Sequence, residues 1–125
     1  MGRVMFISER GFPHVVVNVN HGEWYGFKPR IPKMVLSPGL LDRSNLMAKI
    51  KHAASFTIDD GLIARQIPPI VTRYQFSWYK GGVHDCVSFA ADIAEALGLQ
   101  MPKRPNFWPD NFVISLATLN GRIAT

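Results

Sequence analysis

The residues most suited to chemistry surround the only cysteine of the chain, Cys86. Two glycines precede the run His84-Asp85-Cys86, and the apolar residues after it recur at steps of three and four, which predicts an amphipathic helix. Gly98 follows these residues, where a glycine commonly ends a helix. A thiol in the first turn of a helix lies at the positive end of the helix dipole, which favours a nucleophilic thiolate. The alternative is a buried structural cysteine, against which the polar neighbours argue.

A nucleophilic thiol needs a base to accept its proton, and the chain has four histidines. His84 lies in the same loop as the thiol, from which its side chain is expected to diverge, and His21 lies at the expected tip of a hairpin. His14 and His52 each begin an expected strand. The spacing does not choose between these two, and a structural role is the alternative for either.

Antiparallel strands are predicted for the first part of the chain. Residues 4–7 form a short strand, and residues 13–19 and 23–27 form a hairpin joined by Asn20, His21 and Gly22, with Gly22 at a positive φ. Alternation assigns two faces to the hairpin's first strand, Val15, Val17 and Val19 on one and His14, Val16 and Asn18 on the other. Residues 52–58 alternate well enough for a further strand.

Proline and glycine predict the irregular segments. Residues 30–45 are expected to form an ordered surface loop with little regular structure, and residues 46–51 are ambiguous. Residues 78–82 are expected to be a loop, and residues 102–105 a linker.

Helices complete the expected fold. Asp59 or Thr57 is suited to cap a helix over residues 60–66, which Pro68 and Pro69 interrupt, so that residues 70–76 continue at a changed angle. Residues 109–121 predict a last helix that a glycine ends. The order of these elements predicts an α+β fold in which an antiparallel sheet packs against helices, including the helix that begins at Cys86.

Length and composition are those of one globular domain, residues 1–125, with 47% hydrophobic and 18% charged residues. A single cysteine excludes an internal disulfide and a cysteine-rich zinc site. No His, Asp and Glu cluster has the spacing of metal ligands, so no cofactor is expected. No apolar run approaches the roughly 20 residues that span a bilayer. The first residues lack the features of a secretory signal, so we expect the cytoplasm of the producing cell as its location.

The net charge of +5 indicates affinity for acidic partners. The basic residues are scattered between prolines, without interleaved aromatic residues: Lys28, Arg30, Lys33, Lys49, Lys51, Lys103 and Arg104. This spacing favours a solvated basic surface over a nucleic-acid groove.

Two segments carry a resemblance to a known family. The run from Tyr79 to Phe89 resembles the nucleophile segment of NlpC-type papain-like cysteine peptidases, in which an aromatic residue and two glycines lead into Asp-Cys at a helix start. In that family a histidine on a strand with a glycine hairpin behind it follows the cysteine, whereas here the matching hairpin from His14 to Phe27 precedes it. The chain therefore resembles the circularly permuted branch, which includes relatives of lecithin–retinol acyltransferase.

The resemblance implies Cys86 as nucleophile and His14 as general base, with Tyr79 and Asp85 as candidates to shape the oxyanion site. Asp85 reads equally well as the helix N-cap. The family's third polar residue lies twelve positions after the histidine, where this chain has Gly26.

The face expected to carry His14 holds Trp24, Gly26 and Lys28, none of which can accept a hydrogen bond from an imidazole through its side chain. A backbone carbonyl or a residue from elsewhere orients His14, or the site is a dyad. Glu23 enters only if the strand register slips by one residue.

The resemblance implies a cysteine amidase or peptidase that acts through a thioester, with bacterial cell-wall peptides as the expected substrate. Without a secretory signal, delivery as an antibacterial effector by a system such as type VI secretion is one expectation, and a cytoplasmic substrate is the other. A protein inhibitor is a further expected partner.

Two alternatives stay open. One is acyl transfer or lipid ester hydrolysis by the same dyad, with an acyl pocket lined by Trp24, Trp78, Phe107 and Trp108. The other is a non-catalytic binding module, which the glycine at position 26 favours.

Overall fold

The computed structural model describes residues 1–11, 13–45, 47–103 and 108–125, and it is an α+β fold as predicted. Its elements follow one another along the chain as β1 (Gly2–Glu9), β2 (Val15–Val19), β3 (Glu23–Pro29), β4 (Leu36–Asp42), a 3₁₀ turn η1 (Met47–Lys49), β5 (Ile50–Ile58), α1 (Asp60–Gln75), β6 (Trp78–Lys80), α2 (Cys86–Ala96) and α3 (Pro109–Leu119). The strands form one antiparallel sheet in the order β5-β1-β2-β3-β4-β6.

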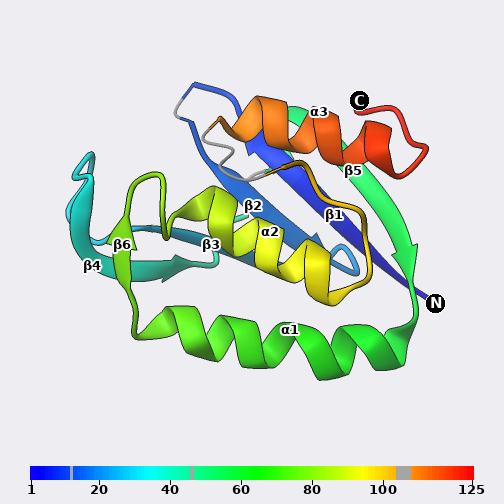
Figure 1. The fold of residues 1–125 in the computed structure, drawn as a ribbon, viewed down its shortest axis with the longest axis horizontal. Coiled ribbons are helices and arrows are strands. Elements are labelled where there is room, and N and C mark those ends of the chain that lie inside the picture. The colour runs from blue at the N-terminus through cyan, green and yellow to red at the C-terminus, as the bar shows by residue number, and fades with distance from the viewer. Residues whose placement is uncertain (12, 46, 104–107) are drawn as a thin grey trace.

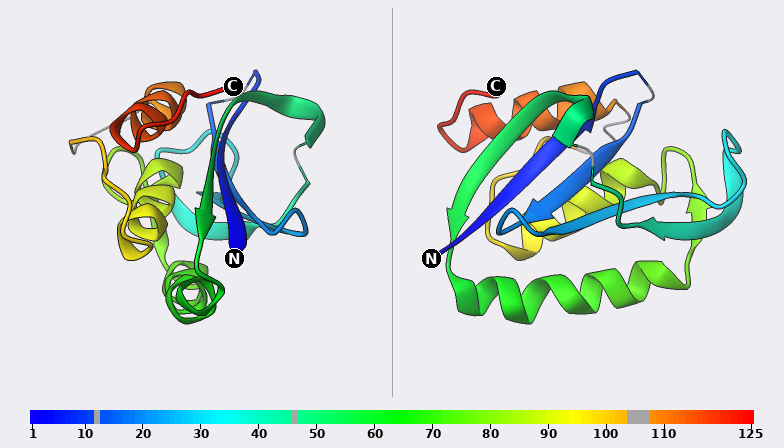
Figure 2. Two further views of the ribbon diagram at one scale, coloured as in Figure 1. Left: turned by 90° about the vertical axis from the view of Figure 1, so that its right-hand side faces the viewer. Right: turned by 180° about the vertical axis from the view of Figure 1, so that it is seen from behind.

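The helices α1, α2 and α3 all cover the same face of the sheet (Figures 1 and 2). The alternation in β2 explains this arrangement, since Val15, Val17 and Val19 are buried in the main core with the apolar residues of the helices. The opposite face carries a smaller cluster that includes Met5, Val16 and Trp24. His14 precedes β2 and belongs by alternation to this second face.

The predicted hairpin is confirmed, including its register, in which Val17 pairs with Tyr25 and Val16 with Gly26. The expectation of a positive φ at Gly22 is wrong. Asn20 and His21 have the positive φ angles, of 52° and 62°. Asparagine tolerates this region, and the Asn20 side chain accepts a hydrogen bond from the backbone of Arg3 at 2.8 Å, which holds the turn against β1.

The prediction of a loop over residues 30–45 is wrong, because residues 36–42 form β4 between β3 and β6. Gly39 is there for packing and not for a turn. A Cβ atom on it would lie 2.4 Å from the ring of Phe27 and 2.5 Å from the carbonyl oxygen of Ser77. The prediction of a loop over residues 78–82 is also wrong, since Trp78–Lys80 forms the short strand β6, which pairs with β4.

The expected interruption at Pro68 and Pro69 is also wrong, because α1 runs through both prolines. Asp59 caps this helix by accepting a hydrogen bond from the backbone of Leu62 at 3.0 Å. Each proline removes one backbone hydrogen bond, at a cost of about 3 kcal/mol. Burial of five residues on one side of the helix outweighs that cost, and these are Ile63, Ile67, Ile70, Val71 and Tyr74.

The last two helices are confirmed near their expected ends. Asp85 caps α2, and Gly98 after it has a φ of 79°. Gly121 follows α3 with a φ of 71°. Three residues of the sequence expectations lie outside the described residues. They are Arg104 of the basic surface, Phe107 of the acyl pocket and Pro105 of the linker.

Candidate active site

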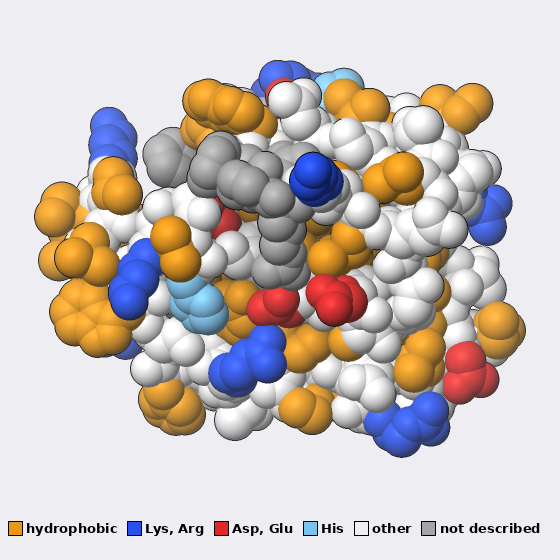
Figure 3. All heavy atoms as spheres, in the orientation of Figure 1, with side chains coloured by type: hydrophobic (Ala, Val, Ile, Leu, Met, Phe, Trp, Pro, Cys, Tyr) orange, Lys and Arg blue, Asp and Glu red, His pale blue; other side chains and the backbone are white. Residues whose placement is uncertain are grey.

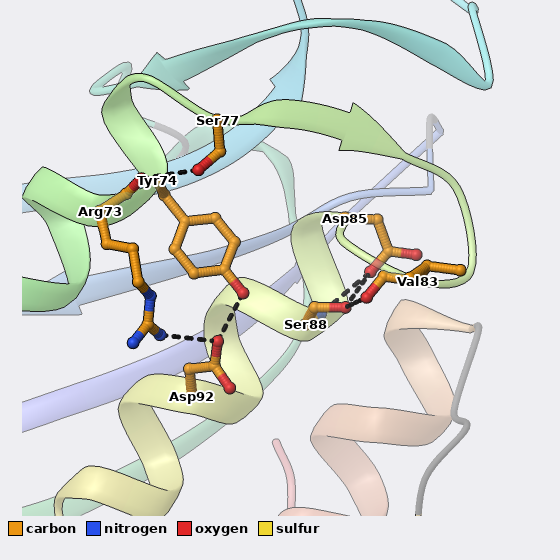
Figure 4. A network of polar contacts seen from close by, with 7 residues as sticks. All are labelled: Arg73, Tyr74, Ser77, Val83, Asp85, Ser88 and Asp92. Atoms are coloured by element: carbon orange, nitrogen blue, oxygen red, sulfur yellow. Dashed lines mark hydrogen bonds and ion pairs between the residues drawn. The ribbon is translucent and has the colours of Figure 1, made fainter.

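Cys86 is the first residue of α2, and the loop before it is held by Asp85. One oxygen of the Asp85 carboxylate accepts a hydrogen bond from the backbone of Ser88 at 2.9 Å (Figure 4). The other oxygen accepts one from the backbone of Gly82 at 2.7 Å. Gly82 has a φ of 80°, which lets the loop fold back onto the helix end. Asp85 is therefore the cap that the sequence allowed, and both of its carboxylate oxygens already accept hydrogen bonds from the backbone.

A second set of contacts holds the same loop from the side of α1. The ring of His84 stacks on Tyr74 with 4.2 Å between centroids, and Phe27 meets it edge-on at 5.5 Å. Tyr74 in turn donates a hydrogen bond to Asp92 of α2 at 2.5 Å, and Arg73 contacts the same carboxylate at 3.1 Å (Figure 4). The histidine beside the nucleophile segment is thus part of the packing between α1, β3 and the loop.

The thiol of Cys86 is buried, with 5% of the residue exposed. Burial raises the pKa of Cys86 to about 12, although the backbone N–H groups of Val15, Val87 and Cys86 itself favour the thiolate. The expected stabilisation by the helix N-terminus is therefore present but is outweighed by burial in this conformation. The contact with Val15 places the thiol beside the residue that follows His14.

His14 lies just before β2 and is 4% exposed. Its Nε2 atom lies 3.8 Å from a carboxylate oxygen of Asp42. Burial lowers the pKa of His14 to about 4, and the charge of Asp42 opposes this change. The ring is therefore neutral at pH 7 and able to accept a proton.

Asp42 is the residue that the sequence interpretation missed. Val16 pairs with Gly26, and Gly26 pairs with Asp42 on the next strand, so the carboxylate reaches His14 across the glycine. A Cβ atom on Gly26 would lie 2.9 Å from Nε2 of His14. Gly26 is therefore the space through which the imidazole approaches the next strand.

The carboxylate of Asp42 is held in place by its neighbours. Burial raises its pKa, but hydrogen bonds from Ser44 and the charge of Lys28 outweigh burial and lower the pKa of Asp42 below its usual value. Ser44 donates through its hydroxyl at 2.6 Å and its backbone N–H at 3.0 Å, and Nζ of Lys28 lies 3.5 Å away. Asp42 is therefore ionised at neutral pH and can orient the His14 ring.

The other candidate bases lie elsewhere. His52 is on β5, two strands from β2 in the sheet, and its backbone N–H donates to Ser8 at 3.2 Å. His21 is exposed at the hairpin tip and contacts Arg3. Of the two histidines that the spacing left open, His14 is the one next to Val15, whose backbone contacts the thiol.

Tyr79 lies on β6 and packs on Phe27 with 5.6 Å between ring centroids. Burial, together with the charges of Cys86 and Asp85, raises the pKa of Tyr79 above its usual value. The hydroxyl therefore keeps its proton, and Tyr79 lies close enough to Cys86 and Asp85 for their charges to act on it.

The tryptophans do not form the acyl pocket expected from the sequence. Trp24 is buried in the smaller cluster, Trp78 lines a pocket beside Arg30, and Trp108 lines another beside Glu9. The fourth aromatic residue of that expectation, Phe107, lies outside the described residues.

His14 and Asp42 line a pocket of about 630 Å³, whereas Cys86 does not. Phe27 and Leu41 pack in or against the main core, so their neighbours Lys28, Leu40 and Asp42 point to the other face of the sheet. The pocket therefore opens on the side away from the helices. There the segment between β4 and β5 curves out (Figure 2, left).

No protein-family model, curated protein or solved structure matches this chain. Within the described residues no three His, Cys, Asp or Glu side chains are grouped to hold a metal ion. The helices of the same part of the chain include none that is long and apolar enough to cross a membrane.

Proposed function

We propose that this protein is a cysteine amidase or peptidase of the permuted NlpC-like type, with Cys86 as nucleophile, His14 as base and Asp42 as the residue that orients the base. The observation that carries the proposal is the approach of Asp42 to His14 across Gly26, next to the contact between the thiol and Val15.

The arrangement supports a general-base mechanism. With Asp42 facing Nε2, the proton of the neutral ring is favoured on that atom, and Nδ1 has to reach the thiol past Val15, because the His14 pocket opens on the face away from α2. Sulfur attacks the amide carbonyl as the thiol proton moves to His14, and the N–H groups at the start of α2 with the Tyr79 hydroxyl stabilise the oxyanion. The C–N bond then breaks, and His14 gives the proton to the leaving amine. Water, deprotonated by the same ring, hydrolyses the thioester and releases the acid and the thiol.

The resting pair is neutral, because burial raises the pKa of Cys86 and lowers that of His14. Proton transfer therefore accompanies attack and does not precede it. Since only 5% of Cys86 is exposed, substrate binding also has to uncover the thiol.

Cell-wall peptides are the proposed substrate, on the strength of the two resembling segments and a basic surface suited to an anionic polymer. On the face shown in Figure 3 the Lys and Arg side chains lie apart from one another, which fits weak general attraction better than a nucleic-acid groove. Delivery to a competing bacterium by a contact-dependent system, with a protein inhibitor in the producing cell, would suit such an enzyme.

The second candidate is a non-catalytic module on the same fold. The burial of Cys86, which raises its pKa to about 12, is the observation that favours it.

The test exposes the purified protein to soluble muropeptides and, separately, to phospholipid vesicles, and follows the mass of the Cys86 peptide after acid quenching. We expect an acyl adduct from muropeptides alone, absent in Cys86→Ala and His14→Gln and slower to form in Asp42→Asn. His52→Gln is the matched control and should behave as the wild type. An adduct formed from lipid alone would favour the acyltransferase function over the amidase function. If neither substrate gives an adduct while the protein stays folded, the non-catalytic binding module is the remaining candidate.

A further inference from the structure

The pocket beside His14 has an excess of positive charge. Its lining includes four basic residues, Lys28, Arg30, Lys33 and Lys49, but only two acidic ones, Glu9 and Asp42. These residues come from the ends of β1, β3 and β4 and from the segments that follow β3 and β4. A concave site with one dominant sign of charge concentrates ligands of the opposite sign.

The acidic residues of the lining already have basic partners. Glu9 lies 4.0 Å from Lys49, and Asp42 lies 3.5 Å from Lys28. Arg30 and Lys33 have no ion pair within the described part of the chain. Arg30 and Lys33 are thus available to pair with the negative charge of a ligand.

The pocket also holds a buried polar atom that makes no hydrogen bond, although the Asp42 carboxylate lies 3.8 Å from it. Nε2 of His14 has no hydrogen-bond partner among the described residues, although the residue is 4% exposed. The walls beside it include Pro29, Pro32 and Leu40, which offer apolar contact. The combination of apolar wall, excess cations and one buried polar atom is typical of a binding site for a small organic anion.

We propose that this pocket binds a carboxylate-bearing ligand of peptide size, with the carboxylate on Arg30 and Lys33 and the body of the ligand against Leu40. Binding itself does not depend on the proposed function. Its consequence for catalysis rests on that function, since the anion would offset the positive field that Lys28 exerts on His14 and make the ring a stronger base. The carboxylate belongs to an acidic side chain of the substrate or to a free anion that acts as an effector.

The test uses the full chain carrying Cys86→Ala, so that no turnover is needed and failure of catalysis leaves the result readable. The peptides acetyl-Ala-Glu-Ala-amide and acetyl-Ala-Gln-Ala-amide are titrated against it by NMR, with free glutarate in a parallel arm. We expect the acidic peptide to bind about 10-fold more tightly than the neutral one, as one charge-assisted contact provides. Bound anion should also raise the pKa of the His14 ring above its value of about 4.

Arg30→Gln and Lys33→Gln should each abolish most of the preference for the acidic peptide. Arg122→Gln, which removes the same charge from an exposed residue outside the lining, is the matched control and should preserve the preference. Tighter binding of the peptide than of glutarate assigns the carboxylate to substrate, and the reverse assigns it to an effector. Equal affinity for the two peptides, or an equal loss in Arg122→Gln, would overturn the proposal.

Discussion

Substitution of Gly26 by alanine should separate His14 from Asp42 without removing either side chain. A Cβ atom at this position would lie 2.9 Å from Nε2 of His14 and 3.0 Å from Cγ1 of Val16. Val16 is 1% exposed and cannot move aside, whereas the buried His14 ring can move only into the pocket that it lines. Overpacking of this kind costs about 1–3 kcal/mol, and misplacing a catalytic ring by about 1 Å costs roughly 100-fold in rate.

Two measurements test this reasoning before any substrate is known. Urea denaturation gives the loss of stability, and an NMR titration of His14 shows whether its pKa rises from about 4 toward 6.5 as the ring leaves its buried position. Gly22→Ala on the same hairpin is the matched control, since its Cβ atom would have its nearest neighbour, the Asn20 carbonyl oxygen, at 3.9 Å. The reasoning is refuted if Gly26→Ala is as stable as the control and His14 titrates as in the wild type.

Three further predictions follow from burial and capping at the site. Lowering the pH from 7 to 4 should destabilise the wild type by about 3 kcal/mol more than His14→Gln, because burial lowers the pKa of His14 from 6.5 to about 4 and the unfolded chain takes up a proton that the folded state does not. Urea denaturation across this range measures the difference, and parallel curves would contradict it. Iodoacetamide at pH 8 should modify native Cys86 about 1,000-fold more slowly than the denatured chain, since burial raises the pKa of the thiol from 9.0 to about 12. Mass spectrometry follows this reaction, and native and denatured rates within tenfold of each other would rule the burial out. Asp85→Ala should cost about 1 kcal/mol or more of unfolding free energy, because it removes the cap of α2 and the bond to Gly82. Thermal unfolding checks this, with Asp60→Ala at the exposed start of α1 as the comparison.

The elements that the sequence predicts well are those with local signals. The hairpin from Val15 to Phe27 alternates at the period of a strand, and α2 has an aspartate before it and a glycine after it. Such signals act within a few residues of the backbone that they shape. The predicted hairpin and helix form in the structure because the packing of the sheet against the helices also favours them.

The elements that the sequence does not predict depend on distant residues. Pro38 and Gly39 have the composition of a turn, but the ring of Phe27 and the carbonyl of Ser77 require a residue without a side chain at position 39. In α1, the apolar face that meets the sheet decides the path of the helix through Pro68 and Pro69.

Asp42, the proposed third residue of the site, is not predicted from the sequence for the same reason. Asp42 ends a strand that reads as a loop, so its distance from His14 was invisible in the sequence. The usable signal was the glycine at position 26. A second hairpin after β3 would have placed a residue of the next strand beside it, and the only acidic residue between Phe27 and Asn45 is Asp42.

The order of the sheet has a consequence for how the protein is made. Strands β1 to β5 find all their pairing partners among themselves, apart from the outer edge of β4, within the first 58 residues. A ribosome therefore completes the strands that hold His14 and Asp42 before it adds Cys86. Until the helices emerge, the face that carries Val15, Val17 and Phe27 is uncovered, which exposes apolar surface to aggregation. Cys86 is added in the last third of synthesis, and α2 and α3 then cover the core.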